Sequence, residues 1–269
     1  MLTTEVENFP GFEEPILGPD LIQHMMKQAE RFGAEFIQDE AMSVDFKTRP
    51  LKVSTAGKTY EASGVIIATG ASAKWLGLES ETRLRGKGVS SCATCDGFFF
   101  RGKDTVTVGG GDVALEDTMF LTKFANHATI IHRRDALRAS KILQDRASKN
   151  SKISFVWDSV VEEILGQHKV EGVRVRNVKT GKQDVLKCDG VFVAIGHEPN
   201  TAIFQGQIEL DQKGYVVTRQ GTSTSVEGVF ACGDVRDFHY RQAITAAGDG
   251  CRAAMDAEDY LEGKVLGAH

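Results

Sequence analysis

Apolar residues recur along this chain in two rhythms, and together these predict an α/β protein. Helical spacing between Gly18 and Gly33 predicts a helix that ends at Gly33, with an apolar face formed by Leu21, Ile22, Met25, Met26, Ala29 and Phe32. Strand-like runs occupy 35–37, 43–46 and 51–54. Wholly apolar runs at 65–68, 191–195 and 229–231 lead into glycines, which predicts strands buried on both faces, as in a parallel sheet.

The middle of the chain has the pattern of a βαβ unit. A strand over 105–108 runs into a glycine-rich turn, a helix is expected over 112–125, and a second strand over 128–131. The buried side of that helix is predicted to consist of Val113, Phe120, Leu121 and Phe124. A helix over 140–147 and a strand over 153–157 follow. Runs at 160–165, 170–178 and 185–187 predict a small antiparallel meander, and the last helix is expected over 241–261.

Composition narrows the class of protein. A net charge of −5 gives no support to a nucleic-acid or anionic-membrane partner. No apolar run reaches the roughly 18 residues that a membrane span needs, and the first residues lack the pattern of a signal peptide. The 5 cysteines fit a reducing compartment better than a secreted disulfide framework. We therefore expect a soluble, cytoplasmic protein.

Cys92-Ala93-Thr94-Cys95 is the first motif that carries chemistry. Two residues between cysteines let the sulfurs close and reopen a small disulfide ring, so this spacing predicts a redox dithiol. Half of a zinc site is the alternative, but it needs two further ligands at close spacing. The neighbouring Asp96 could move a proton at the dithiol or could cap a helix. The other cysteines are far apart and are expected to be buried packing residues: Cys188, Cys232 and Cys251.

Gly109-x-Gly111-Asp112-x-Ala114 is the second motif. It follows a β-branched strand and opens a helix, which is the context in which backbone N–H groups cradle a dinucleotide pyrophosphate. The small residue at Ala114 allows the helix and the strand to pack closely. An ordinary turn is the alternative, and the flanking strand and helix favour the nucleotide site.

The end of the second strand indicates which nucleotide binds. An NAD site would carry Asp or Glu there, whereas this chain carries His132, Arg133 and Arg134, with Arg138 one helical turn further on. Arginine guanidinium groups suit a 2′-phosphate. The alternative is a solvated basic patch. The position at the strand end favours NADPH as cofactor.

These residues resemble the low-molecular-weight thioredoxin reductases, the NADPH-dependent flavoproteins of bacterial, plant and fungal type. The likeness extends from Thr3 to about Glu262. It rests on the dithiol and glycine motifs above and on the segments Thr3–Gly11, Ala68–Ala71, His132–Arg134, Gly196–Asn200, Gly233–Val235 and Tyr240–Ala243.

The resemblance implies two Rossmann-like domains joined by a two-stranded hinge, in a homodimer. Residues 1–74 and 196–269 would form a discontinuous FAD-binding domain, and 75–195 an NADPH-binding domain that carries the dithiol. Electrons would pass from NADPH to FAD, then to the dithiol, then to the disulfide of thioredoxin. Cys95 would face the flavin, Cys92 would attack thioredoxin, and Asp96 would act as general acid or base.

The resemblance also implies flavin contacts. Asp234 would hold the ribityl chain, and Gln242 and Ala243 at a helix N-terminus would meet the isoalloxazine ring, where the positive end of the helix favours the anionic reduced flavin. The other residues implied to bind this cofactor are Asn8, Thr69, Gly70, Gly233 and Arg241.

One part of the family pattern lies outside this sequence. Family members begin with a strand, a G-x-G-x-x-G loop and a helix, roughly forty residues that cradle the FAD pyrophosphate, so the FAD domain is expected to be N-terminally truncated. Losing three or four charged hydrogen bonds forfeits at least about 4 kcal/mol, or about a thousandfold in affinity. Either the sequence is incomplete, or it is a short form that holds FAD poorly. A flavin-poor NADPH-binding protein with a slow or idle dithiol is the alternative function, and a reductase for a peroxiredoxin or another thioredoxin-like domain is a third.

Overall fold

A computed structural model describes residues 5–264. Thr3 and Thr4, where the resemblance begins, and the residues after Lys264 lie outside this range. The chain divides into two compact units: one contains the described residues up to Met25 with Ala73–Gly196, and the other contains Met26–Ser72 with the described residues from His197 onward.

A five-stranded parallel sheet forms the centre of the first unit. Its strand order is β11 (Ile153–Val156), β10 (His127–Ile131), β9 (Asp104–Gly109), β15 (Gly190–Ala194) and β8 (Val89–Ser90). β9 and β10 align so that Val108 lies opposite Ile131, which brings the carboxyl ends of both strands to one edge. The predicted βαβ unit is confirmed, with α4 over Asp112–Leu121 and α5 over Lys141–Lys149.

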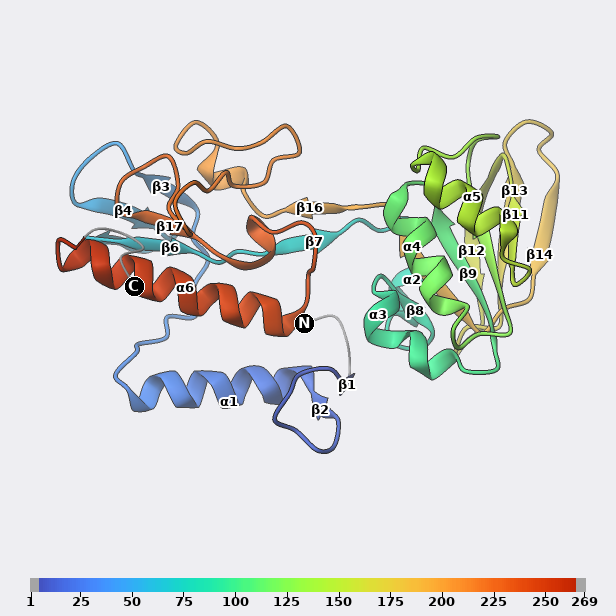
Figure 1. Ribbon diagram of the computed structural model, residues 1–269, viewed down its shortest axis with the longest axis horizontal. Helices are drawn as coiled ribbons and strands as arrows, with labels where there is room; N and C mark the ends of the chain where they lie inside the picture. The colour runs from blue at the N-terminus through green and yellow to red at the C-terminus, as the bar shows by residue number, and fades with distance from the viewer. Residues whose placement is uncertain (1–4, 265–269) are drawn as a thin grey trace. The chain divides into compact units, whose positions relative to one another are not determined.

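Different elements pack against the two faces of this sheet. Successive strand residues point to opposite faces, and Ile130 packs with Leu115 of α4 and Ala147 of α5. Ile131 packs instead with Val161 and other residues of an antiparallel meander. That meander consists of β12 (Ser159–Leu165), β13 (Gly172–Asn177) and β14 (Gln183–Leu186), as predicted (Figure 1).

One prediction about α4 is wrong. Val113 is 39% exposed, although the apolar pattern placed it on the buried side. The buried face of α4 consists of Ala114, Leu115, Thr118 and Leu121. Helical spacing fixes which residues share a face, but it does not fix which face turns to the sheet. The small Ala114 lies against the strand, and this turns Val113 outward.

Short elements complete the first unit. β1 (Glu5–Val6) pairs with β2 (Ile16–Leu17), and α2 spans Glu79–Leu84. A short helix α3 (Ala93–Asp96) continues into the 3₁₀ helix η1 (Gly97–Phe100). α1 covers Gly18–Arg31 and begins in this unit, but its residues from Met26 onward belong to the other unit. Gly33 follows it with φ +91°, in the left-handed region expected of a residue that ends a helix.

The second unit contains three small sheets. β3 (Ser43–Asp45), β4 (Leu51–Ser54) and β5 (Thr59–Ala62) are antiparallel, β6 (Val65–Ile67) pairs in parallel with β17 (Val229–Ala231), and β7 (Ala71–Ala73) pairs with β16 (His197–Pro199). The 3₁₀ helices η2 (Ala202–Phe204) and η3 (Gly233–Val235) and the long helix α6 (Ala243–Leu261) complete it. Its core includes Phe46, Leu51, Ile67, Phe204 and Val229.

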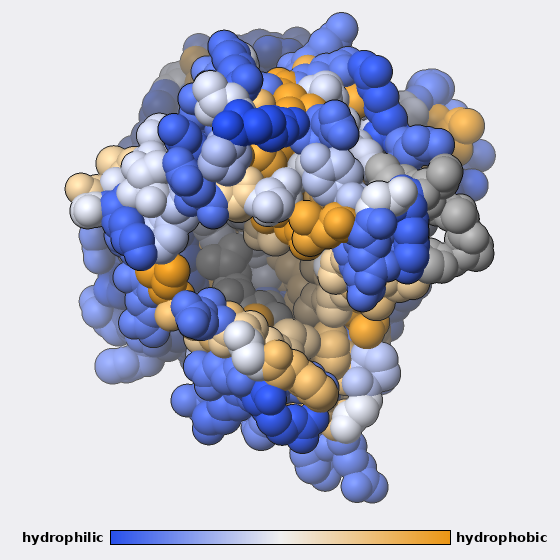
Figure 2. All heavy atoms as spheres, turned by 90° about the vertical axis from the view of Figure 1, so that its left-hand side faces the viewer, coloured by the Kyte–Doolittle hydropathy of each residue, from blue (hydrophilic) through white to orange (hydrophobic). Residues whose placement is uncertain are grey.

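Two predictions are wrong in this part of the chain: burial of 65–68 on both faces, and a strand at 35–37. Ile66 is 41% exposed, whereas Ile67, which points to the opposite face of β6, is buried. Phe32 is 78% exposed, and residues 35–37 form no strand. Further large apolar side chains are exposed here, among them Phe36 and Met42. Figure 2 shows apolar side chains interrupting a largely hydrophilic surface on the face that it views.

Candidate functional site

The dithiol lies at the start of α3. Cys92 and Cys95 form a disulfide, with their Cα atoms 5.3 Å apart, and both residues are half-buried. Between them, Ala93 is fully buried in a cluster with Phe100, Leu121 and Phe192. This anchor joins the short helix to α4 and to the central sheet, so the redox pair is held on rigid structure while its sulfurs stay near the surface.

Asp96 and Ser90 flank the disulfide. The Ser90 hydroxyl accepts the backbone N–H of Cys92 at 3.0 Å. Burial raises the pKa of Asp96, and a hydrogen bond with Ser90 works in the opposite direction. The Asp96 side chain makes no capping bond to η1, so the structure gives no support to the helix-capping alternative. A carboxyl with a raised pKa beside a disulfide is suited to proton transfer.

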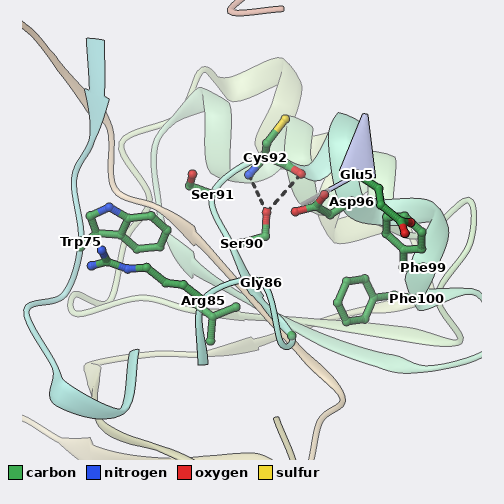
Figure 3. Close-up of a pocket in the computed structure, with 12 residues that line it drawn as sticks. Glu5, Trp75, Arg85, Gly86, Ser90, Ser91, Cys92, Asp96, Phe99 and Phe100 are labelled. Atoms are coloured by element: carbon green, nitrogen blue, oxygen red, sulfur yellow. Dashed lines mark hydrogen bonds between the residues drawn. The ribbon is translucent and has the colours of Figure 1, made fainter. Parts of the chain in front are cut away.

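A cavity of about 340 Å³ opens beside Cys92 (Figure 3). Its walls include the ring of Phe99, the carboxyl of Asp96 and the side chains of Trp75 and Arg85. The Arg85 guanidinium lies 4.0 Å from the centre of the Trp75 ring, a cation–π contact. Trp75 and Arg85 stand in no sequence motif, so neither could be recognised from the sequence as a site residue.

Glu81 holds this wall in place. Its carboxylate is fully buried, accepts the N–H groups of Leu76 at 2.8 Å and Gly77 at 3.0 Å, and lies 3.7 Å from Arg85. A buried carboxylate with two backbone donors and a cation is well compensated. One signal was present in the sequence: Glu81 and Arg85 stand at the i, i+4 spacing of an ion pair.

The glycine loop has the close packing that its sequence predicts. A Cβ on Gly109 would lie 2.6 Å from the Cβ of Ala114, so strand and helix touch there. A Cβ on Gly110 would lie 2.3 Å from the His132 ring, whereas one on Gly111 would meet no atom within 4 Å. The space at Gly111 lies directly before the first turn of α4. This open backbone at a helix N-terminus fits the pyrophosphate of a dinucleotide.

The basic residues after β10 divide into two kinds. His132 is buried, and its Nε2 lies 3.1 Å from the Ala136 carbonyl. Arg133, Arg134 and Arg138 are exposed, and no carboxylate within residues 5–264 forms an ion pair with them. These three guanidinium groups therefore fit an added phosphate, while His132 supports the loop through its contact with Gly110.

Asp112, at the start of α4, has a visible structural contact. Its Oδ1 accepts the backbone N–H of Ser140 at 2.6 Å. The Gly110 carbonyl accepts the N–H groups of Arg138 at 2.7 Å and Ala139 at 3.2 Å. These bonds tie the glycine loop to the segment that precedes α5. A direct contact of Asp112 with a nucleotide stays a prediction.

The predicted flavin contacts gather mainly in the second unit. The Thr69 hydroxyl donates to the Asn200 carbonyl at 2.8 Å, and the Asn200 N–H donates to the Gly70 carbonyl at 3.0 Å. Asp234 lies in η3, and Gln242 caps α6 in a reciprocal pair of hydrogen bonds with Thr245. Asn8 belongs to the first unit.

Arg241, the residue before Gln242, lies among unsatisfied groups. Its backbone has φ +49°, unusual for a residue with a side chain, and its Nε is buried with no partner among residues 5–264. The Nδ1 of His197 is also buried and unpartnered, and burial followed by the charge of Arg241 lowers the pKa of His197 to about 4. Burial raises the pKa of Asp234. Strain and unsatisfied polar atoms together fit a site that a polar ligand completes, and flavin has such polar groups.

His197 is a site residue that was not predicted, although it stands just after the wholly apolar run at 191–195. The prediction that all three remaining cysteines are buried is wrong for Cys251, which is exposed on α6; Cys188 and Cys232 are buried as predicted. The helical period of α6 turns Cys251 away from its buried neighbour Ala253. Within residues 5–264, no helix has the length and apolar character needed to cross a membrane.

Known proteins resemble this chain along almost its whole length. Residues 1–250 match the family model described as pyridine nucleotide-disulphide oxidoreductase. The thioredoxin reductase of Rickettsia conorii is 56% identical over 265 residues, which cover 97% of this chain and 86% of that protein. That of Streptomyces coelicolor is 54% identical, with 97% and 82% covered.

Solved structures give the same result. The thioredoxin reductase of Streptococcus pyogenes superposes with a TM-score of 0.91 at 44% identity and covers 97% of this chain and 85% of that one. The thioredoxin reductase from Giardia duodenalis also gives a TM-score of 0.91, at 41% identity, with 97% and 86% covered. The predicted α/β fold of a nucleotide-dependent disulfide reductase is confirmed, and the chain belongs to the thioredoxin reductase family of the pyridine nucleotide-disulphide oxidoreductases.

Proposed function

We propose that this chain is a thioredoxin-disulfide reductase that takes electrons from NADPH through FAD to Cys92 and Cys95. The observation that carries the proposal is the closed Cys92–Cys95 disulfide beside the half-buried Asp96, in the same compact unit as the glycine loop. The likeness to reductases at 53–56% identity favours this function over a flavin-poor binding protein with an idle dithiol.

The proposal assigns the two cofactors to different parts of the chain. Residues 75–195 would bind NADPH, with its pyrophosphate at Gly109 and Gly111 and its 2′-phosphate at Arg133 and Arg134. Residues 1–74 and 196–269 would bind FAD. When bound, FAD supplies the two-electron chemistry that joins a nicotinamide to a disulfide.

The chain's own residues account for the disulfide chemistry. Two electrons and two protons open the Cys92–Cys95 bond to a pair of thiols. The Cys92 thiolate then attacks one sulfur of the thioredoxin disulfide, which breaks the S–S bond, forms a mixed disulfide and releases the other thioredoxin sulfur. Asp96 would donate the proton that this leaving sulfur needs. Attack by Cys95 on Cys92 closes the ring again and releases reduced thioredoxin.

The proposal extends to assembly and location. A homodimer is proposed from the family resemblance, and the cytoplasm from the cysteine usage. Thioredoxin is the proposed protein substrate, since the relatives bear its name. A peroxiredoxin or another thioredoxin-like domain would be separated from it by direct comparison as substrates.

The test measures thioredoxin-dependent reduction of an artificial disulfide with NADPH. We expect the purified chain to be active, Cys92→Ser to abolish transfer to thioredoxin and to keep NADPH binding, and Cys251→Ser, which removes an exposed thiol elsewhere, to behave as wild type. A Cys92→Ser variant that reduces thioredoxin at the wild-type rate would refute the assignment. A colourless protein that binds NADPH and reduces no disulfide would support the flavin-poor alternative.

A further inference from the structure

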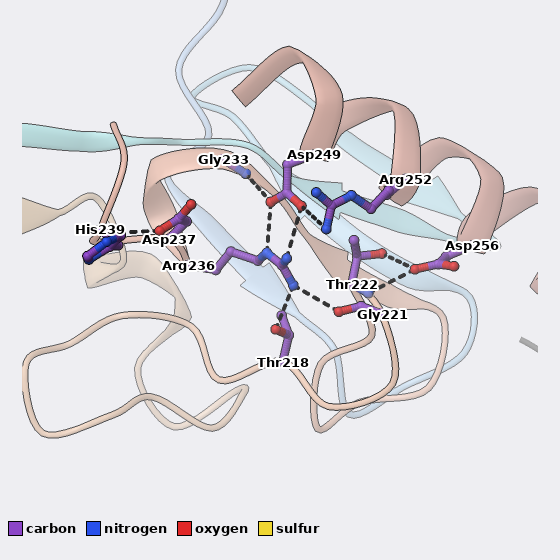
Figure 4. A network of polar contacts seen from close by, with 10 residues as sticks. All are labelled: Thr218, Gly221, Thr222, Gly233, Arg236, Asp237, His239, Asp249, Arg252 and Asp256. Carbon is purple, nitrogen blue, oxygen red and sulfur yellow. Dashed lines mark hydrogen bonds and ion pairs between the residues drawn. The ribbon is translucent and has the colours of Figure 1, made fainter. Parts of the chain in front are cut away.

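A buried carboxylate in the second unit collects three hydrogen bonds, and the proposed function does not use it. Asp249 on α6 is 5% exposed. Its Oδ2 accepts the backbone N–H of Gly233 at 2.8 Å and the Nε of Arg236 at 2.7 Å, and its Oδ1 accepts the Nη2 of Arg236 at 2.9 Å (Figure 4). The contact with Arg236 is therefore a two-pronged pair, the most strongly oriented form of ion pair.

All three nitrogens of the Arg236 guanidinium donate hydrogen bonds. Its Nη1 donates to the Thr218 hydroxyl at 2.7 Å and to the Gly221 carbonyl at 2.8 Å. The nearby Arg252 is mostly exposed and lies 3.8 Å from Asp249, so it adds little direction. Asp249 and Arg236 together join three segments: α6, the turn that begins at Gly233, and the loop around 218–221.

The turn held in this way is η3, which carries Asp234 at its centre. Gly233 has φ +72°, and a Cβ there would lie 3.6 Å from Ala246, so the turn rests on α6. The Asp234 carboxylate accepts no hydrogen bond from residues 5–264. The backbone of Asp234 is held from both sides, because Asp249 binds Gly233 just before it and Arg236 two residues after it.

We propose that Arg236 and Asp249 are a positioning pair that fixes the carboxylate of Asp234 relative to the amino end of α6, so that Asp234 meets the hydroxyl-bearing ribityl chain of FAD. The inference rests on the proposed function for the identity of the cofactor. Neither member of the pair touches the cofactor in this account; each acts through the geometry of the turn.

Ion-pair energetics explain why such a pair affects geometry more than stability. A buried ion pair contributes little net stability, because desolvation offsets the attraction. Its value lies in direction: a carboxylate that accepts two guanidinium donors and one backbone N–H has a single orientation. An apolar pair of equal volume would bury the same surface, but it would leave the turn free to shift along α6.

The test uses a matched control on the same helix. Asp256 lies two helical turns after Asp249 and accepts the N–H of Thr222 at 2.8 Å and its hydroxyl at 2.6 Å, but it does not touch η3. Asp249→Asn and Asp256→Asn each remove one anchoring charge from α6. The whole purified chain is stripped of flavin, and three quantities are measured: FAD affinity by flavin fluorescence, hydrogen–deuterium exchange over 229–237, and the thermal midpoint.

We expect Asp249→Asn to weaken FAD binding about tenfold or more and to speed exchange at 233–235. Asp256→Asn should lower the thermal midpoint by a similar amount and leave FAD affinity within about twofold. Arg236→Lys keeps the charge but has no guanidinium fork, so it should give an intermediate loss. If Asp249→Asn yields no folded protein, the FAD affinity of Arg236→Lys is compared with that of Asp256→Asn instead.

Equal effects of the two Asn variants on FAD affinity would overturn the inference, and so would unchanged exchange at 233–235 in Asp249→Asn. The exchange measurement needs no cofactor. If FAD affinity falls across the variants in the expected order but the wild-type chain reduces no thioredoxin, the proposed function is refuted and the positioning pair is supported. If the wild-type chain reduces thioredoxin and Asp249→Asn binds FAD with normal affinity, the proposed function is supported and the positioning pair is refuted.

Discussion

Replacing Arg133 and Arg134 by alanine tests the choice between the two nicotinamide nucleotides. Both guanidinium groups are exposed just after β10, and no carboxylate within residues 5–264 competes for them. Because β9 and β10 are adjacent and parallel, with Val108 opposite Ile131, the two arginines lie at the same edge of the sheet as the glycine loop. A nucleotide seated on that loop brings its ribose towards this edge.

The expected size of the effect follows from exposure. Hydrogen bonds to charged groups contribute about 1.5–3 kcal/mol each, and exposed groups belong at the lower end. Two such contacts with the 2′-phosphate give about 3 kcal/mol, which is a change of about 150-fold in affinity. NADH has no 2′-phosphate, so its KM should stay nearly constant. The ratio of the two KM values should therefore shift by about two orders of magnitude.

Steady-state reduction of thioredoxin, with NADPH and NADH varied in turn, measures this ratio. Arg146→Ala with Lys149→Ala is the matched control: it removes the same charge from the same unit, but from the end of α5, which the parallel strand order places at the opposite edge of the sheet. The control should leave both KM values within about twofold. An equal rise in the KM for NADPH and for NADH in the Arg133 and Arg134 variant would refute the 2′-phosphate assignment.

Three further predictions concern single residues. Burial raises the pKa of Asp96 above its ordinary 3.8, so the wild type loses stability as the pH rises from 3.8 through the raised value. Asp96→Asn should therefore have a higher thermal midpoint than wild type at pH 7, and this difference should close below pH 3.8. The same variant should transfer electrons to thioredoxin more slowly. Gly110→Ala should lower stability by about 1–3 kcal/mol, because its Cβ meets the buried His132 ring, whereas Gly111→Ala should keep the thermal midpoint and weaken NADPH binding; equal midpoints for the two variants would contradict this. Burial lowers the pKa of His197 to about 4, so wild type should lose stability as the pH falls from 6.5 towards 4, and in pH-dependent unfolding His197→Gln should lose less.

Local sequence patterns were sufficient for the nucleotide-binding half of the fold. The strand at 104–109, the glycine loop and α4 follow one another directly, so neighbouring residues determine the βαβ unit. The dithiol could be predicted for the same reason, since its chemistry depends on a spacing of three residues. The antiparallel meander also follows from short turns between alternating runs.

The remaining features depend on contacts between distant parts of the chain. Ile66 stands in a run with the composition of a strand buried on both faces, yet its exposure depends on what the folded chain packs against its face of β6. Glu81 looks like an ordinary helical acid until the fold brings the N–H groups of Leu76 and Gly77 to it. Asp249 likewise gains its meaning from Gly233, which stands 16 positions away.

The pairing of β7 with β16 has a consequence for the order of folding. The N–H of Lys74 donates to the carbonyl of Gly196 at 2.9 Å, so the two ends of the segment between them lie side by side. If residues 73–196 fold first, they bring Lys74 and Gly196 together. The parts of the chain on either side can then pair without the entropy cost of closing a long loop. We therefore expect nucleation inside 73–196, with the flanking parts assembling on a preformed anchor during synthesis.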